Sequence, residues 1–495
     1  MDAIRLRNYR CFEDTNWVNL KHINLLVGAN SSGKSSFLKF FPLLKQSTRI
    51  RLHGVFKWLG NDVDFKDFYN TVQDGKDEMI IDYKVDNLPI YQRFSGSLKY
   101  LPNVNVSFTI ASIDKHFDMV KCLNVSYSGT DIHVEYGNNN DVVLLVNGLS
   151  SDSFQGLKVE SVNVDATYPR LLFKYKNDTQ GKDLVSNFLR QKLINEAKTL
   201  GGRFCESSKL MFFERIPLSY ENFKKGVDGI SKQDVDEAKA LNLYRLCLLY
   251  NINQLIDSLN IHLIKLASHI VYVKPIRATI ERYYRFQNLD LEDIDPDGSN
   301  LPMYLYNLGS NVLDAFNEWL NIHFKFKVQI KSSEGHIELL VVEEGKSARN
   351  TVDLGFGYTQ LLPILAILWK TVFLDLEDPE KITKPSEHII VVEQPELHLH
   401  PRFQGVVAEM LATLASLAVS KNLNLRIIVE THSEIILNKL GEYVEAKILN
   451  QDDVNVLMME QNDKGISSIR STRYSEEGYL EDWPRNFMED VDKDR

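Results

Sequence analysis

The clearest chemical pattern in the sequence is a glycine-rich turn between an apolar run and a helix-like run. Residues 28–35 read Gly-Ala-Asn-Ser-Ser-Gly-Lys-Ser and satisfy the pattern GxxxxGK[ST] at every fixed position. Glycines there allow backbone amides to face phosphates, Lys34 neutralises phosphate oxygens, and the Ser35 hydroxyl can ligate Mg²⁺. The context favours this P-loop over a chance glycine-rich turn. The predicted nucleotide contacts are Asn30, Ser31, Ser32, Gly33, Lys34, Ser35 and Ser36.

A second pattern supplies the carboxylate that such a loop requires. Residues 388–396 read His-Ile-Ile-Val-Val-Glu-Gln-Pro-Glu, an apolar strand that ends on Glu393. Ligands of open α/β sheets collect at the carboxyl ends of strands, so Glu393 is predicted to hold Mg²⁺ through its water shell. A buried strand with an ordinary acidic turn is the alternative, and the P-loop makes it less favoured. Together the two patterns predict a site for ATP and Mg²⁺.

The elements around these residues alternate between two kinds of pattern. Apolar runs at residues 3–8, 23–27, 388–392 and 425–429 predict strands, and the last three are typical of central strands in a parallel sheet. Residues 36–44 and 355–373 predict helices. Short alternating runs between residues 80 and 177 predict an antiparallel sheet, and residues 184–267 have helical spacing. No heptad pattern persists, so long coiled-coil arms are not expected.

Several segments resemble one group of ATPases. Residues 4–12, 353–360, 393–401 and 430–433 are similar in sequence and order to segments of ABC-type AAA ATPases related to the OLD and SMC proteins. Residues 274–277, 281–284, 297–298 and 478–487 are similar more loosely. The resemblance implies an α/β fold, an ABC/SMC-like P-loop ATPase head with a mixed sheet and a largely helical insertion. We expect an N-terminal ATPase lobe with Walker A and antiparallel sheet (1–180), a helical insertion (181–270), a C-terminal ATPase lobe with signature, Walker B and H-loop (271–474), and an acidic tail (475–495).

The same resemblance implies a head that works as a dimer, or as a higher homo-oligomer of dimers. The signature segment 355–360, with Gly357, Thr359 and Gln360, would open a helix whose amide-rich N-terminus faces the nucleotide of a partner copy. His432 matches the H-loop histidine, which contacts the γ-phosphate and orients water. Without the resemblance, a histidine after a strand is more often structural.

One departure from the group concerns hydrolysis. ABC ATPases carry a glutamate as general base after the Walker-B acid, whereas this chain has Gln394, and an amide cannot accept the proton from water. Glu396 is predicted to be the base, with Glu393 and His432 completing the catalytic set. His400 stands where the D-loop has aspartate. Gln46 is either a γ-phosphate-sensing glutamine or, more commonly, a surface residue.

Bulk properties restrict the class of protein. The 495 residues are 44% hydrophobic and 25% charged, as in a globular chain with a real core. The four cysteines form neither a CxxC pair nor a disulfide framework, no signal segment opens the chain, and the longest apolar run is too short to span a membrane, which predicts a soluble cytoplasmic protein. The net charge of −10 argues against a uniformly basic nucleic-acid surface.

One local charge pattern leaves nucleic acid as an open partner. Residues 170–225 hold twelve basic and six acidic residues with interleaved phenylalanines, which could grip phosphates and stack bases. A solvated helix face with its aromatics in the core is the plainer interpretation.

The resemblance suggests what the ATPase is for. Too little chain follows His432 for the TOPRIM nuclease domain of OLD proteins, so we do not expect the chain to be a nuclease by itself. Its layout is similar to stand-alone ATPases such as the PtuA subunit of Septu and the AriA subunit of PARIS. That implies an ATP-binding and ATP-hydrolysing regulatory subunit of a bacterial antiphage defence complex, which controls a separately encoded nuclease or toxin effector. The alternatives are an SMC-like DNA-repair ATPase and a nucleotide-gated scaffold that hydrolyses little ATP.

Overall fold

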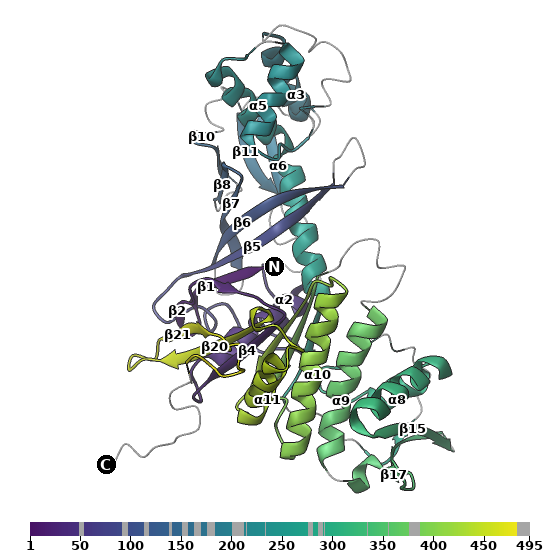
Figure 1. Ribbon diagram of the computed structural model, residues 1–495. Helices are drawn as coiled ribbons and strands as arrows, with labels where there is room; N and C mark the ends of the chain where they lie inside the picture. The colour runs from purple at the N-terminus through teal and green to yellow at the C-terminus, as the bar shows by residue number, and fades with distance from the viewer. Residues whose placement is uncertain are drawn as a thin grey trace. The chain divides into compact units, whose positions relative to one another are not determined.

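The computed structural model describes residues 1–48, 54–91, 98–112, 118–137, 141–150, 157–162, 170–175, 184–199, 212–213, 215–232, 234–275, 281–285, 291, 293–333, 335–354, 356–375 and 387–482. The chain forms two compact units (Figure 1). Unit 1 comprises Met1–Asn19 and Gln46–Ser268, and unit 2 comprises Leu20–Lys45 and His269–Arg495. Both units combine sheets with helices, which confirms the predicted α/β class.

Unit 2 is built on a mixed sheet of the order β13-β18-β19-β4-β20-β21. Its first five strands are parallel, and the last is antiparallel to its neighbour. The strands are β13 (Ile270–Val273), β18 (His388–Glu393), β19 (Leu425–Glu430), β4 (Ile23–Gly28), β20 (Val454–Gln461) and β21 (Ser467–Thr472). Every residue of β4 and β18 is buried, as expected for central strands of a parallel sheet that is covered on both faces.

Helices cover this sheet, and three of them lie side by side in Figure 1 as α9, α10 and α11. The helices of the unit are α1 (Lys34–Leu38), α2 (Phe40–Thr48, in this unit up to Lys45), α7 (Leu301–Asn307), α8 (Ser310–Phe324), α9 (Phe356–Lys370), α10 (Pro401–Ser420) and α11 (Glu434–Glu445). A smaller sheet contains β14 (Tyr284–Arg285), β15 (Phe326–Ser333), β16 (His336–Glu343) and β17 (Arg349–Asn350), and the short helices η2 (Thr351–Leu354), η3 (Thr371–Asp375) and η4 (Gln451–Asp453) complete the unit.

Two segments of unit 2 are long and apolar enough to cross a membrane by length and composition. They are Gly357–Asp375, which includes α9, and Pro401–Ser420, which is α10. Leucine and alanine side chains of both belong to the buried apolar core of the unit. Core helices meet the same length and composition test, so these segments are weak evidence of a membrane span.

Unit 1 is dominated by an antiparallel sheet of the order β10-β9-β8-β7-β6-β5-β1-β2, with β3 paired to β1. The strands are β1 (Ala3–Tyr9), β2 (Phe12–Asp14), β3 (Val18–Asn19), β5 (Glu78–Tyr91), β6 (Leu98–Ser112), β7 (Asp118–Tyr127), β8 (Thr130–Tyr136), β9 (Val142–Val146) and β10 (Leu149–Ser150). A separate hairpin joins β11 (Leu157–Val162) to β12 (Arg170–Tyr175). The helices are α3 (Leu184–Thr199), α5 (Tyr220–Ser231) and α6 (Glu237–Ser268).

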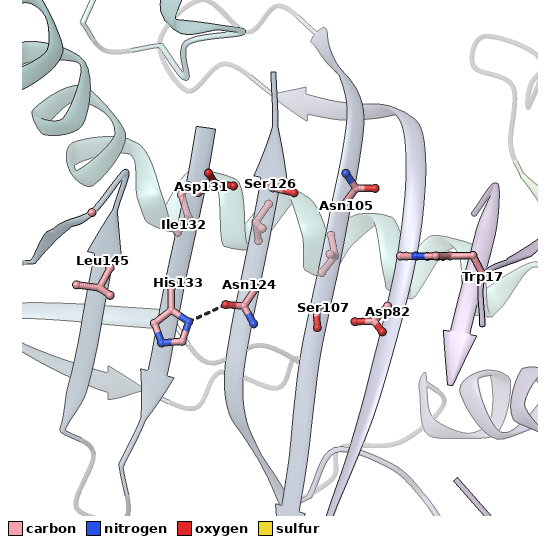
Figure 2. Close-up of a pocket in the computed structure, with 13 residues that line it drawn as sticks. Trp17, Asp82, Asn105, Ser107, Asn124, Ser126, Asp131, Ile132, His133 and Leu145 are labelled. Carbon is pink, nitrogen blue, oxygen red and sulfur yellow. Dashed lines mark hydrogen bonds between the residues drawn. The ribbon is translucent and has the colours of Figure 1, made fainter. Parts of the chain in front are cut away.

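One face of the unit 1 sheet is polar. Figure 2 shows His133, Asn124, Ser107 and Asp82 on four neighbouring strands, with Trp17 at the end of the row. They line a shallow hollow of about 350 Å³, in which His133 Nδ1 lies 2.6 Å from Asn124 Oδ1. Alternation along β6 places its apolar side chains on the opposite, buried face.

The structure differs from the sequence predictions in two ways. The helix predicted over residues 36–44 is two helices, α1 and α2, because Pro42 fits the first turn of a helix but not its interior. The observed units also divide the chain differently from the predicted domains, since the P-loop strand β4 pairs with β19 and β20 of the C-terminal lobe.

Two predicted features lie partly outside the described residues. Of the basic segment 170–225, the structure describes only residues 170–175, 184–199, 212–213 and 215–225. Of the acidic tail, it describes residues 475–482, so the segment from Trp483 onwards lies outside.

The close approach of Gly441 and Gly478 generates a test of stability. A Cβ atom on Gly441, within α11, would lie 2.2 Å from the carbonyl oxygen of Gly478. The backbone at Gly478 cannot move aside without a large cost in free energy. We therefore expect Gly441→Ala to destabilise unit 2 by about 1–3 kcal/mol in urea unfolding. The matched control is Gly405→Ala in α10, where a Cβ meets nothing within 4 Å and should stabilise by up to about 1 kcal/mol. Equal unfolding midpoints for the two variants would contradict this packing.

Candidate functional site

Three parallel strands of unit 2 bring the predicted site together at one edge of the sheet. Strand β19 lies between β18 and β4, and the register pairs Glu393 with Glu430. Glu430 is in turn paired with Leu26, two residues before Gly28. The carboxyl ends of all three strands therefore meet where ligands of open α/β sheets bind.

The P-loop has a conformation that requires its glycines. Gly28 has a φ of +144°, and a Cβ there would lie 2.2 Å from the carbonyl oxygen of Met459. Gly33, which precedes α1, has a φ of +102°. Both values lie where residues with a Cβ are strained, so this backbone depends on glycine. Close approach of the loop backbone is what phosphate binding demands.

Lys34 is placed inside the loop that it is predicted to serve. Its side chain is only 4% exposed, and Nζ donates to the carbonyl oxygens of Gly28 at 2.9 Å and Ala29 at 2.6 Å. Burial lowers the pKa of Lys34, while the nearby carboxylates of Glu430 and Glu396 act in the opposite direction. The ammonium group is thus held where phosphate oxygens could replace the two carbonyls.

The remaining P-loop residues differ in exposure. Asn30 and Ser31 are exposed and Ser36 is half-buried. Ser32 is buried, and its hydroxyl oxygen has no hydrogen-bond partner within the described part of the chain. A buried hydroxyl without a partner is costly, so Ser32 also fits a loop that receives a polar ligand. Contact of these residues with nucleotide stays a prediction.

Glu393 ends β18 as the sequence predicted, and it is held by two neighbours. It is 4% exposed and accepts a hydrogen bond from the Tyr272 hydroxyl at 2.5 Å. The ammonium group of Lys39, just after α1, lies 3.4 Å from its other oxygen. The carboxylate is therefore fixed in orientation at the sheet edge, and its role as a metal ligand stays a prediction.

Glu430 is the residue of the site to which sequence reasoning gave no role. It is 2% exposed, and its Oε1 accepts a hydrogen bond from the Ser35 hydroxyl at 2.8 Å. Its Oε2 is buried without a hydrogen-bond partner among the described residues. Burial, and then the adjacent charge of Glu393, raises the pKa of Glu430 to about 7. The signal in the sequence was an acid that ends the next predicted strand after Glu393.

Glu396 and His432 are brought together, but through the histidine backbone. Glu396 accepts from the His432 backbone N–H at 2.6 Å and from the Thr431 hydroxyl at 2.9 Å, so each of its oxygens holds the loop after β19. Burial, followed by the charge of Lys34, lowers the pKa of His432, which favours a neutral ring at pH 7. The base role of Glu396 and the γ-phosphate role of His432 stay predictions.

The signature segment lies at the start of α9, and its residues differ in burial. Thr359 and Gln360 are buried, and a Cβ on Gly357 would lie 3.0 Å from the ring of Phe403. Before the helix, Asp353 forms an ion pair with Arg282. Gly355 lies outside the described residues. Contact of Gly357, Thr359 and Gln360 with a partner's nucleotide stays a prediction.

Two further residues have structural partners. Gln46, in unit 1, is buried, so the surface interpretation of this residue is wrong. Its amide accepts from the backbone N–H of Val63 at 3.0 Å and donates to the carbonyl of the same residue at 3.1 Å, which fixes the loop around Val63. His400 caps α10, because its Nδ1 accepts from the Arg402 backbone N–H at 3.3 Å.

Comparison with known proteins places the chain in a family. The AAA ATPase domain family matches residues 1–437. No curated protein gives a significant match. Among solved structures, the SMC head domain from Thermotoga maritima is similar at 10% identity and a TM-score of 0.36, with 95% of this chain and 97% of that chain covered.

Two other solved structures are similar at a comparable level. The Smc head domain with an extended coiled coil bound to the C-terminal domain of ScpA, derived from Pyrococcus furiosus, has 10% identity and a TM-score of 0.31, with 95% of each chain covered. A structure from work on ATP-driven dimerization and DNA-stimulated activation of SMC ATPases has 14% identity and a TM-score of 0.22, with 34% of this chain and 88% of that chain covered. At these scores the likenesses carry no argument about activity or partners.

The burial of Lys34 within the loop predicts its contribution to nucleotide binding. We expect Lys34→Ala to weaken ATP binding by at least about 100-fold in a fluorescent-nucleotide titration, because a charge-assisted contact with the phosphates is lost. The control is Lys439→Ala, which removes a half-exposed lysine paired with Glu442 on α11. Retained ATP affinity in the Lys34 variant would contradict the site assignment.

Proposed function

The chain belongs to the AAA ATPase domain family and is a P-loop ATPase, and we propose that it binds Mg²⁺-ATP at residues 28–36 as a slowly hydrolysing regulatory switch. One observation carries the proposal. The buried ammonium of Lys34 lies within the loop backbone, beside a sheet edge where Glu393 and Glu430 are paired in register. This arrangement supplies a cation for the phosphates and carboxylates for a metal.

The support for slow hydrolysis is the set of residues that follows Glu393 in the chain. The residue after Glu393 is Gln394, whose amide cannot accept a proton. The next carboxylate, Glu396, has one oxygen bound to Thr431 and the other to the His432 backbone. Gln394 supplies no base and Glu396 is engaged in holding the loop after β19, so hydrolysis would be slow and ATP would remain bound for long periods. A long-lived ATP state suits a protein that signals its nucleotide state to another molecule.

The switch would act by closing two copies of the chain around ATP. The support is the sequence resemblance, in which the signature segment of one head faces the P-loop nucleotide of another. Nucleotide binding would then be coupled to dimer closure, because ATP binds the closed form better than the open form. The proposal includes higher homo-oligomers built from such dimers.

We further propose that the closed dimer controls a separately encoded nuclease or toxin of an antiphage defence system. This proposal rests on the resemblance of the sequence to stand-alone regulatory ATPases of that kind. Co-expression with the neighbouring genes, followed by affinity purification with and without ATP, tests it. Recovery of an effector whose activity changes with nucleotide supports the proposal, and duplex-DNA binding that stimulates ATPase would instead favour the DNA-repair function.

Gln394 offers a direct test of the slow switch. We expect Mg²⁺-ATP to dimerise the wild-type chain in light scattering. The dimers should persist after free ATP is removed by rapid buffer exchange. Gln394→Glu places a carboxylate after Glu393 and should raise single-turnover phosphate release by about 100-fold or more, since a general base contributes on that scale.

The control for this experiment is Gln461→Glu at the exposed end of β20. It adds the same charge away from the site and should leave phosphate release unchanged. Wild-type release at tens of turnovers per second would reject the slow switch, whereas failure of the wild type to dimerise would reject closure around ATP.

A further inference from the structure

Two buried carboxylates lie side by side at the edge of the unit 2 sheet, and they are not equally satisfied. Glu393 and Glu430 end adjacent parallel strands and are partners in register. Glu393 has the Tyr272 hydroxyl on one oxygen and Lys39 near the other. Glu430 has the Ser35 hydroxyl on Oε1, while Oε2 is buried without a hydrogen-bond partner among the described residues.

No hydrogen-bond donor among the described residues reaches this free oxygen, although the charges of Lys34 and Lys39 both act on Glu430. A buried carboxylate oxygen without a partner is costly, and two adjacent carboxylates repel each other. Lys34, the nearby cation of the P-loop, donates to the carbonyls of Gly28 and Ala29. A divalent cation at this edge would remove both penalties at once.

The chemistry of the donor groups indicates which cation fits. No group of three or more histidine, cysteine, aspartate or glutamate side chains that could hold a metal occurs in the described part of the chain. A metal here would therefore depend on a hydroxyl, two carboxylates, phosphate and water. Mg²⁺ prefers this combination, since it is bound by one or two carboxylates and substrate phosphates and keeps several waters.

We propose that Glu430 is a second carboxylate of the Mg²⁺ site, acting with Ser35 and Glu393 on the cation that accompanies ATP. The inference rests on the proposed binding of Mg²⁺-ATP at the P-loop. Glu430 has two roles there, one for each oxygen. Oε1 accepts the hydrogen bond from the Ser35 hydroxyl, which would leave the lone pairs of the Ser35 oxygen for the metal. Oε2 receives a hydrogen bond from a metal-bound water.

Glu396 provides a contrast within the same site. Both of its oxygens hold the loop after β19, through the Thr431 hydroxyl and the His432 backbone. Each of its oxygens therefore already has a hydrogen-bond partner, unlike Oε2 of Glu430. The difference in partners, rather than the number of acidic residues, singles out Glu430.

The test measures metal binding separately from nucleotide binding. The variant is Glu430→Gln, whose amide oxygen can still accept from Ser35, so the loop should be preserved. With a non-hydrolysable ATP analogue bound, Mn²⁺ affinity measured by electron paramagnetic resonance should fall about 10- to 100-fold. Affinity for the same analogue in EDTA should stay equal or rise, because a negative charge near the phosphates has been removed. A structural role would weaken both.

Two further variants complete the design. Glu442→Gln, which removes an exposed carboxylate from α11, is the matched control and should change neither affinity. Glu430→Asp keeps the charge but withdraws it by one methylene, and it should give an intermediate loss of Mn²⁺ affinity. It replaces the amide variant as the test if that variant does not fold.

The outcomes separate this inference from the function on which it rests. Wild-type Mn²⁺ affinity in Glu430→Gln, with analogue binding intact, overturns the role of Glu430 and leaves the ATP site standing. Loss of analogue binding in EDTA by a folded Glu430→Gln also overturns it. A wild-type chain that binds neither the analogue nor Mn²⁺ overturns the proposed function and this inference together.

Discussion

The parallel register of β18, β19 and β4 is the constraint on which the site depends. It places Glu393 opposite Glu430, and Glu430 beside the strand that leads into the P-loop. A slip of one residue would turn Glu430 to the other face of the sheet, away from Ser35. Such a slip would also separate the pair Glu393 and Glu430 and break the hydrogen bond between Glu430 and Ser35.

Charge balance explains why this edge can hold two acids without a compensating ion pair for each. Lys34 and Lys39 supply positive charge from the loop and from the end of α1, and His432 stays neutral because burial and Lys34 both lower its pKa. These charges do not fully compensate Glu430, since burial and the charge of Glu393 raise its pKa despite both lysines. A divalent cation bound at this edge would add positive charge beside it.

The sequence was sufficient for the parts of the site that are local in the chain. The P-loop and the end of β18 each consist of consecutive residues with one chemical function, so their patterns can be recognised without knowledge of the tertiary structure. Glu430 was not, because its importance comes from being next to Glu393 in a sheet, and strand order is a property of tertiary structure. Gln46 shows the same limit, since its partner Val63 lies on a loop that no local pattern ties to it. The division of the predicted helix into α1 and α2 was missed, although Pro42 was a local signal for it.

The connection between β18 and β19 bears on how the loss of any single acid should be interpreted. The Gln394 backbone N–H donates to the Glu430 carbonyl at 2.9 Å, and Glu396 holds the Thr431 hydroxyl and the His432 N–H. The loops after the two strands are therefore tied together by three hydrogen bonds. Removing Glu396 would release His432 as well as a carboxylate, so lost activity in such a variant would not identify a base. Glu430 differs in this respect, because one oxygen of its side chain binds the P-loop serine and the other has no hydrogen-bond partner among the residues that the structure describes.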